Sequence, residues 1–174
     1  MSQLVDFYLL QGRDPEGRTL DQVWGWDNED LEQCHDFIQW MFPLDEPSAF
    51  NPDAPLVTQD DRLAFRTDPQ LQAAMRRSLS VFLAFLGLSV AEDGRVVRGR
   101  DFERRLSLWK HANHNWLRIT RVLKSLRLLG FETEAGAFWA CLRELHEKEG
   151  FVSPDSFQYW REAATGPGAR PFNR

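Results

Sequence analysis

Residues 115–129 read NWLRITRVLKSLRLL, and this stretch decides the fold class. At about 100° per residue, its large apolar side chains share one wide face, which consists of Trp116, Ile119, Val122, Leu123, Leu126 and Leu129. Leu117 and Leu128 fall among the polar residues, which indicates a helix that is covered on two sides. Gly130 follows and ends the helical spacing. The stretch therefore predicts an amphipathic helix inside a helical domain.

Helix start and stop signals recur along the rest of the chain, whereas the alternation typical of strands is scarce. The expected helices run after Ser2 to Gly12, from Asp27 or Asn28 to Pro43, after Thr58, from Asp68–Pro69 to Gly87, over 102–109, from Thr133 to near Gly150, and from Ser153. The one hairpin signal is Asp93–Gly94. We expect an all-α, single compact domain over residues 1–165, with about seven or eight helices, one small β-hairpin near 88–97 and a flexible tail over 166–174.

The segment 43–57 is too rich in proline to be helical throughout, because it holds prolines at positions 43, 47, 52 and 55. A long connection without secondary structure is often functional. The alternative, which we favour, is a packed crossing segment that Phe50, Leu56 and Val57 pin along the core.

The composition excludes several classes of protein. A chain of 174 residues with 43% hydrophobic and 13% aromatic residues can bury a real core, so it is neither disordered nor a disulfide-stapled miniprotein. Cys34 and Cys141 lack metal-ligand spacing, and we expect two free thiols. The N-terminus does not have the pattern of a signal peptide, and the longest apolar run, 81–88, is far shorter than the ~20 residues of a membrane span. These features favour a soluble, cytoplasmic protein.

The formal net charge of −5 conceals a strong asymmetry along the chain. Residues 1–61 hold two basic and fourteen acidic residues, whereas residues 95–127 hold ten basic and two acidic ones, a net of +8. Such a basic segment indicates an anionic partner. The alternative is that the acidic third folds against the basic segment and neutralises it.

The candidate ligand-binding residues lie at the start of the 115–129 helix and along it: His111, His114, Asn115, Arg118, Arg121 and Lys124. Arginines that are partly buried on such a helix must be paired with local acids or with an anionic ligand, and a helix N-terminus attracts the same anions. His111 and His114 have the spacing to share a metal, but no HExxH motif or clustered carboxylate accompanies them. We therefore expect no metal and no cofactor. The alternative is that these His and Asn residues only make structural hydrogen bonds.

Two stretches resemble signatures of a known family. Residues 35–44, HDFIQWMFPL, followed by Glu46–Pro47, and residues 114–126, HNWLRITRVLKSL, are similar to the opioid growth factor receptor conserved region. The resemblance covers roughly residues 20–160 and departs from the family pattern at Trp116 and Arg127. It implies a short, prokaryote-style member without the C-terminal repeats of the animal proteins, which are described as receptors for an enkephalin-type peptide. It brings no catalytic set.

The leading hypothesis is a non-enzymatic binding module whose ligand is a peptide or another anion, bound near the basic helix 115–129. An acidic protein segment would suit the same surface, and a nucleic acid is a less favoured partner. One alternative is a purely structural protein–protein interaction domain. Another is an enzyme that uses His35, His111 and His114 for acid–base chemistry, which requires at least two of them to share a pocket.

Overall fold

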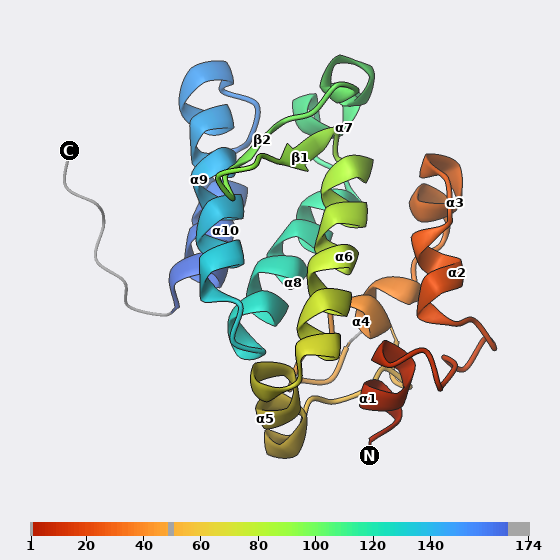
Figure 1. Cartoon of the computed structure of the whole chain (residues 1–174). Coiled ribbons are helices and arrows are strands. Elements are labelled where there is room, and N and C mark those ends of the chain that lie inside the picture. The colour runs from red at the N-terminus through yellow and green to blue at the C-terminus, as the bar shows by residue number, and fades with distance from the viewer. Residues whose placement is uncertain (1, 49–50, 167–174) are drawn as a thin grey trace. The chain divides into compact units, whose positions relative to one another are not determined.

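The computed structural model describes residues 2–48 and 51–166, and it is all-α apart from one β-hairpin (Figure 1). The described residues form ten α-helices, more than expected, because some of the helices are very short. The chain divides into two compact units. Unit 1 comprises residues 1–85 and 128–130, and unit 2 comprises residues 86–127 and 131–174. The expected tail lies outside the described residues, except for Gly166. No helix among the described residues combines the length and the apolar character needed to cross a membrane.

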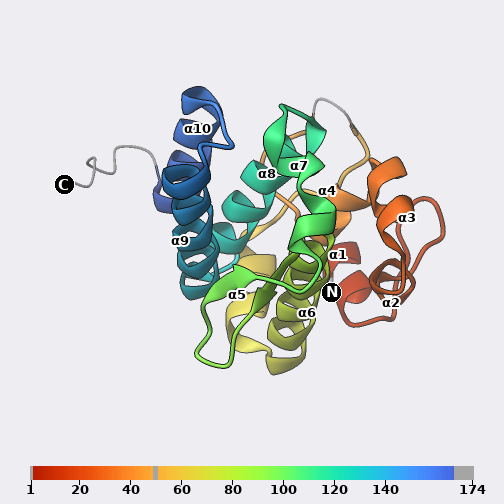
Figure 2. The same cartoon turned by 90° about the horizontal axis from the view of Figure 1, so that it is seen from above.

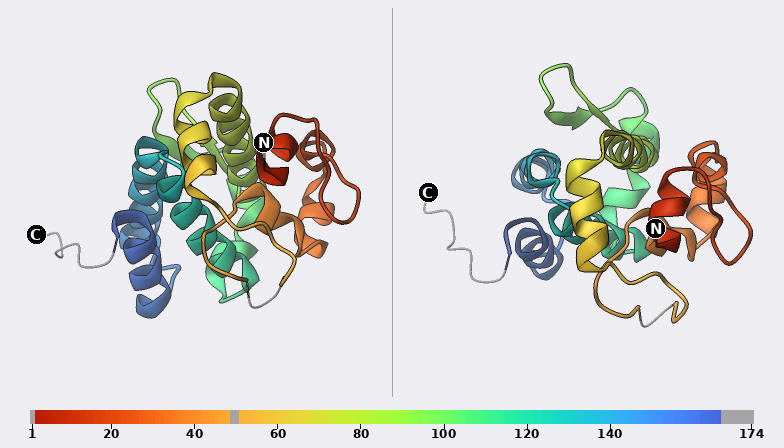
Figure 3. Two further views of the ribbon diagram at one scale, coloured as in Figure 1. Left: turned by 90° about the horizontal axis from the view of Figure 1, so that it is seen from below. Right: turned by 60° about the horizontal axis from the view of Figure 1, so that its bottom comes forward.

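Unit 1 consists of six helices: α1 (Gln3–Tyr8), α2 (Leu20–Trp24), α3 (Asn28–Gln33), α4 (Phe37–Met41), α5 (Gln59–Thr67) and α6 (Pro69–Phe85). Figure 3 shows α5 beside α6. The starts expected for α5 and α6 are confirmed. Thr58 and Asp61 form a capping box at α5, and Asp68 accepts a 2.7 Å hydrogen bond from the Gln70 N–H at the start of α6.

Tyr8 lies at the centre of unit 1, fully enclosed by other side chains. Its hydroxyl donates to the Met41 carbonyl, and its ring meets the Phe65 ring edge-on at 4.8 Å between centroids. Burial raises the pKa of the Tyr8 phenol far above its ordinary value, so the group stays neutral. A buried phenol with a satisfied hydroxyl ties α1, α4 and α5 into one core.

The single helix expected from Asp27 or Asn28 to Pro43 is wrong, because the structure has two helices with a break between them. Asp27 caps α3, which ends at Gln33, and α4 starts only at Phe37. Cys34 is extended, with ψ of 132°, and the Asp36 carboxylate turns back to accept a 3.0 Å bond from Arg18. This long-range ion pair competes with helix continuation, and no local pattern shows it.

Two further details of unit 1 differ from the expectation. Helix α1 ends at Tyr8 instead of reaching Gly12, because Leu10 takes a positive φ of 61° and Gly12 bonds back to the Asp6 carbonyl. Helix α2 was not expected. It is held on α6 through the Trp24 indole, which donates a 2.9 Å bond to Ser78.

The proline-rich segment is partly a packed crossing, as favoured. Leu44 and Leu56 form an isolated parallel bridge, and the Val57 N–H donates a 2.9 Å bond to the Leu44 carbonyl. Val57 is buried, but Leu56 is exposed and does not pin the segment. Phe50 lies outside the described residues.

Unit 2 contains the expected hairpin, in which β1 (Leu88–Val90) pairs antiparallel with β2 (Val96–Arg98) in the register Leu88↔Arg98. The hairpin is followed by a short 3-10 helix η1 (Phe102–Arg105), α7 (Ser107–Lys110), α8 (His114–Leu128, of which 114–127 belong to this unit), α9 (Glu132–Glu149) and α10 (Pro154–Thr165). Helices α9 and α10 lie side by side (Figures 1 and 2).

Indole N–H groups hold the core of unit 2 to the backbone. Trp160 on α10 donates a 2.9 Å bond to the carbonyl of Trp116, and Trp116 donates one of 2.9 Å to the carbonyl of Leu108. Trp109 donates in the same way to the Leu86 carbonyl at 3.1 Å. A buried tryptophan contributes a large apolar area and needs only one acceptor, so these residues link α7, α8 and α10.

Most of the expected helix ends in unit 2 are confirmed, and two are wrong. Gly150 ends α9 in the left-handed region and Ser153 caps α10, as expected. Thr133 does not cap α9, which starts at Glu132 because the buried Phe131 bonds back to the Leu126 carbonyl at 2.7 Å and turns the chain. The helix expected over 102–109 is divided into η1 and α7.

Candidate binding site

Asn113 shapes the start of helix α8. Its side-chain nitrogen donates to the carbonyls of Leu108 at 2.8 Å and His111 at 2.6 Å, and its oxygen accepts a 2.9 Å bond from the Asn115 N–H. This is the turn-forming role that asparagine side chains favour before a helix. The turn places His111 in solvent and His114 at the first position of α8.

The structure joins two of the six candidate residues directly. Arg118 is only 5% exposed, and its Nη1 atom donates a 3.1 Å hydrogen bond to the side-chain oxygen of Asn115, which is fully buried. The guanidinium therefore has a defined orientation inside unit 2, and its burial agrees with the expectation of a buried, paired arginine on this helix, although Leu117, which indicated a second covered side, is exposed. An arginine held in this way stabilises the fold, positions a charge for a ligand, or does both.

The other candidates differ in exposure. His111 and Lys124 are exposed, and His114 and Arg121 are half-buried. Trp116 is buried in the core described above. In the part of the chain that the structure describes, no three His, Cys, Asp or Glu side chains gather in a way that could hold a metal ion.

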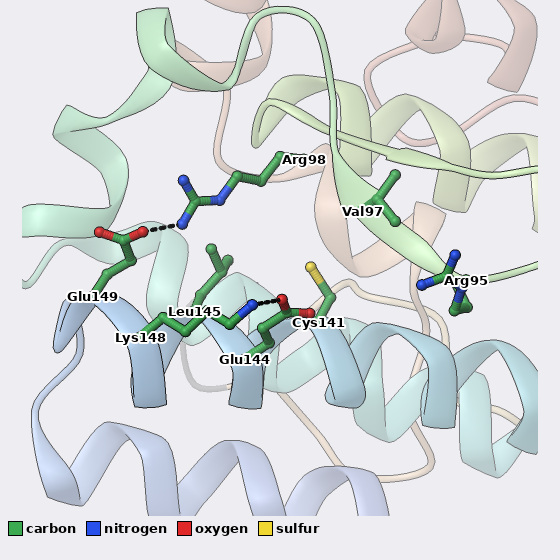
Figure 4. Close-up of a pocket in the computed structure, with 8 residues that line it drawn as sticks. All are labelled: Arg95, Val97, Arg98, Cys141, Glu144, Leu145, Lys148 and Glu149. Atoms are coloured by element: carbon green, nitrogen blue, oxygen red, sulfur yellow. Dashed lines mark hydrogen bonds and ion pairs between the residues drawn. The ribbon is translucent and has the colours of Figure 1, made fainter.

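A pocket of about 390 Å³ lies between β2 and α9 in unit 2, and sequence reasoning missed it. Figure 4 shows the eight residues that line it: Arg95, Val97, Arg98, Cys141, Glu144, Leu145, Lys148 and Glu149. We call it the β2–α9 pocket. Two ion pairs border it, Arg98 with Glu149 and Lys148 with Glu144. Arg95 pairs with Asp93 at 2.7 Å.

The floor of the β2–α9 pocket is apolar. Cys141 and Leu145 are both buried, and Val97 is half-buried. Burial, and then the nearby Glu144 carboxylate, raise the pKa of the Cys141 thiol to about 12. The thiol is therefore neutral at physiological pH, and it acts as a small apolar group. Cys141 and Cys34 are free cysteines, as expected.

A smaller pocket of about 170 Å³ belongs to unit 1, and Arg18 and Asp36 are among the residues that line it. Arg18 donates to Asp14 through Nε at 2.6 Å and to Asp36 through Nη1 at 3.0 Å. Asp14 is buried and also accepts from the backbone N–H groups of Glu16 and Arg18. The arginine of this pocket is thus clamped between two carboxylates.

Part of the β2–α9 pocket is visible in the sequence. Arg95 and Arg98 belong to the basic segment 95–127, and Glu144 and Lys148 have the i,i+4 spacing of a helical ion pair. What no local pattern shows is that the hairpin lies across α9, because that contact joins residues far apart in the chain.

The comparisons with known proteins agree on one family. The family model described as "Opioid growth factor receptor (OGFr) conserved region" matches residues 5–164. The Opioid growth factor receptor of Mus musculus is 37% identical over 123 residues, which is 68% of this chain and 19% of the mouse protein. Opioid growth factor receptor-like protein 1 of Mus musculus is 36% identical over 126 residues, which is 68% of this chain and 26% of that protein.

The human Opioid growth factor receptor is 36% identical over 123 residues, which cover 18% of its length. This chain thus spans about a quarter or less of the length of these curated relatives. No solved structure matches it significantly.

Proposed function

The chain belongs to the opioid growth factor receptor conserved-region family, and from this premise we propose that it is a non-enzymatic binding module. The mouse and human relatives are named receptors, and that name implies that they bind a ligand. This chain carries the region that it shares with them. The ligand we propose is a peptide or another small anion. Its binding site lies at His111, just before α8, and along α8 at His114, Asn115, Arg118, Arg121 and Lys124.

The orientation of Arg118 is the observation that supports this proposal most. Asn115 accepts from its Nη1 atom, so a buried cation already has a defined orientation near the start of α8. A preorganised guanidinium binds a carboxylate or phosphate at a low entropic cost. Lys124 and His111 are exposed on the same segment, and they would guide an anion from solvent.

A structural role is the second candidate, and the burial of Asn115 and Arg118 favours it. In this case the pair completes the core of unit 2, and the family signature reflects packing that supports contacts with other proteins. The enzyme alternative needs two of His35, His111 and His114 in one pocket. None of them lines either of the two pockets described above, so those pockets do not support the enzyme alternative.

A thermal-shift screen of short acidic peptides and phosphorylated metabolites, followed by titration calorimetry of the hits, tests the proposal. We expect Lys124→Ala and His111→Ala to weaken the hits about threefold or more while the melting temperature stays the same. Arg104→Ala is the matched control, because Arg104 is an exposed residue of the same basic segment but lies on η1. Equal affinities for all three variants would place the ligand elsewhere.

Arg118→Ala separates the two candidates. If the pair is purely structural, Arg118→Ala should lower the free energy of unfolding strongly. In that case Lys124→Ala and His111→Ala should bind the hits as tightly as the wild type does. A binding pair predicts weaker hits in those exposed variants as well. Retention on heparin that falls steeply with salt would indicate the nucleic-acid partner instead. The cytoplasmic location stays a prediction of the same proposal.

A further inference from the structure

We propose that the β2–α9 pocket binds a small carboxylate with an apolar body, such as an N-acylated apolar amino acid or a peptide C-terminus. The inference goes beyond the function proposed for α8, because none of the six α8 candidates lines this pocket. Its volume of about 390 Å³ lies in the range of small-ligand sites, about 300–1,000 Å³.

Arg98 is the residue that would bind the carboxylate. Its guanidinium carbon lies 4.6 Å from the centroid of the Phe102 ring, and Phe102 is buried, so a cation–π contact holds the arginine head in place. Among the described residues Glu149 is its one hydrogen-bond partner, through a single Nη2 atom. A guanidinium has five N–H donors and favours bidentate carboxylate binding, so Arg98 retains capacity for a ligand.

The ion pair between Arg98 and Glu149 opposes ligand binding only weakly, because breaking it costs little free energy. The side chains of Arg98 and Glu149 are 40% and 33% exposed, and an exposed pair of this kind contributes only about 0–1 kcal/mol. A ligand carboxylate can therefore share Arg98 with Glu149 or replace it. Three cations and two carboxylates line the pocket, and Arg95 is also paired with Asp93, so the charges around the pocket balance. A single carboxylate can take the place of Glu149 on Arg98, whereas Glu144 and Glu149 would repel a polyanion.

The floor accounts for the apolar body of the ligand. Figure 4 shows Cys141 and Leu145 on α9 and Val97 on β2, between the charged residues. The neutral thiol and the two aliphatic groups offer no strong hydrogen-bond partner, so they favour a hydrocarbon group over a polar one. Contact with such a floor contributes about 25 cal/mol per Å² of apolar area removed from water.

Calorimetry or NMR titration with N-acetyl-leucine as the probe tests the proposal. We expect binding of N-acetyl-leucine, with no measurable binding of N-acetyl-leucinamide, which lacks the charge, or of acetate, which lacks the apolar body. Arg98→Gln should weaken binding about tenfold or more. Arg104→Gln, an exposed arginine paired with Asp101 outside the pocket, should leave it unchanged.

A second variant tests the apolar floor independently. Val97→Phe adds volume inside the pocket without touching the charges, and we expect it to abolish binding while far-UV circular dichroism and the melting temperature are maintained. The proposal is overturned if the amide binds as well as the acid, or if N-acetyl-leucine does not bind. It is also overturned if Arg98→Gln and Val97→Phe both bind N-acetyl-leucine normally.

Two further experiments distinguish a peptide from a free small acid as the ligand, and the β2–α9 pocket from α8 as the binding site. A tripeptide with a C-terminal leucine, compared with the same peptide as its C-terminal amide, shows whether peptides enter. Preference for the free-acid peptide supports a peptide terminus as the source, and binding of N-acetyl-leucine alone supports a free small acid. Lys124→Ala should not affect either probe. If it weakens them as much as Arg98→Gln does, the probes bind at α8, and the β2–α9 proposal fails while the α8 proposal stands.

Discussion

The two pockets use arginine in opposite ways. In unit 1 Arg18 is bound by two carboxylates and its side chain is 18% exposed, and one of those partners, Asp14, has no exposed side-chain surface. In unit 2 Arg98 has one carboxylate partner, and both side chains lie partly in solvent. Both arginines also lie near aromatic rings, Arg18 near Trp26 and Arg98 over Phe102.

The difference shows how to separate a structural arginine from one that can take a ligand. A guanidinium whose donors go to two carboxylates, one of them buried, contributes to folding, and adding an anion there requires breaking the clamp. A guanidinium that is held by an aromatic ring and one exposed carboxylate can exchange partners. The number and burial of the partners therefore distinguish the two arginines better than their own exposure does.

The largest expected effect comes from removing the buried partner of Arg18. Asp14→Ala deletes three hydrogen bonds, two from backbone N–H groups and one from Arg18 Nε. We expect the free energy of unfolding to fall by about 3 kcal/mol, because the substitution leaves three partly buried donors without this acceptor. Urea unfolding measures this change.

Glu149→Ala is the matched control for Asp14→Ala, since it also removes a carboxylate from an arginine. We expect a loss below about 1 kcal/mol, because the Arg98–Glu149 pair is partly solvated. Similar losses from the two variants would mean that burial of the partner does not distinguish the two arginines.

The next effect concerns the support of Arg98. Gly87 has φ of +79°, and a Cβ atom there would lie 2.7 Å from the Phe102 Cα atom. Gly87→Ala should therefore destabilise the protein by about 2 kcal/mol or more, through both backbone strain and the clash. The Arg98 guanidinium lies over the Phe102 ring, so a shift of Phe102 should also weaken N-acetyl-leucine binding.

Gly94→Ala provides the comparison for Gly87→Ala. Gly94 has a similar φ of +83° but no atom within 4 Å of the added Cβ, so only the strain of about 1 kcal/mol should appear. Thermal or urea unfolding of both variants resolves the difference. Equal losses would show that close contact with Phe102 does not matter at Gly87.

The parts of the fold that depend on neighbouring residues could be predicted from the sequence. The Thr58–Asp61 capping box and the Asp93–Gly94 turn are each decided within a few residues, and both are confirmed. The break between α3 and α4 could not be predicted, because it depends on Arg18 reaching Asp36 from a distant part of the chain. Local propensity favoured one helix there, whereas in the structure Cys34 is extended and Asp36 pairs with Arg18.

The candidate site follows the same division. Arg118 is buried and paired, as expected for arginines on this helix, but Leu117 is exposed, so the second covered side that Leu117 and Leu128 indicated is not seen at Leu117. The β2–α9 pocket was missed because it needs the position of the hairpin over α9, which no periodicity shows. Its charges were visible as a basic segment, but their pairing with Glu144 and Glu149 was not.

The smallest expected effect is a pH dependence at Asp36, the second carboxylate of the Arg18 clamp. Burial would raise the pKa of the Asp36 carboxyl, but the hydrogen bond and charge of Arg18 lower it below its ordinary value. A lowered folded-state pKa stabilises the protein above the unfolded value of about 4 and loses that contribution as the pH falls through the folded value. The free energy of unfolding, measured with urea, should therefore fall more between about pH 5 and about pH 3 in the wild type than in Asp36→Asn. Glu144→Gln should change this pH dependence less, because Lys148 lowers the pKa of a Glu144 carboxyl that is largely exposed, where water weakens the pairing. If the Asp36→Asn and wild-type curves fall in parallel, Asp14 alone holds Arg18, and the clamp reduces to one partner, as at Arg98.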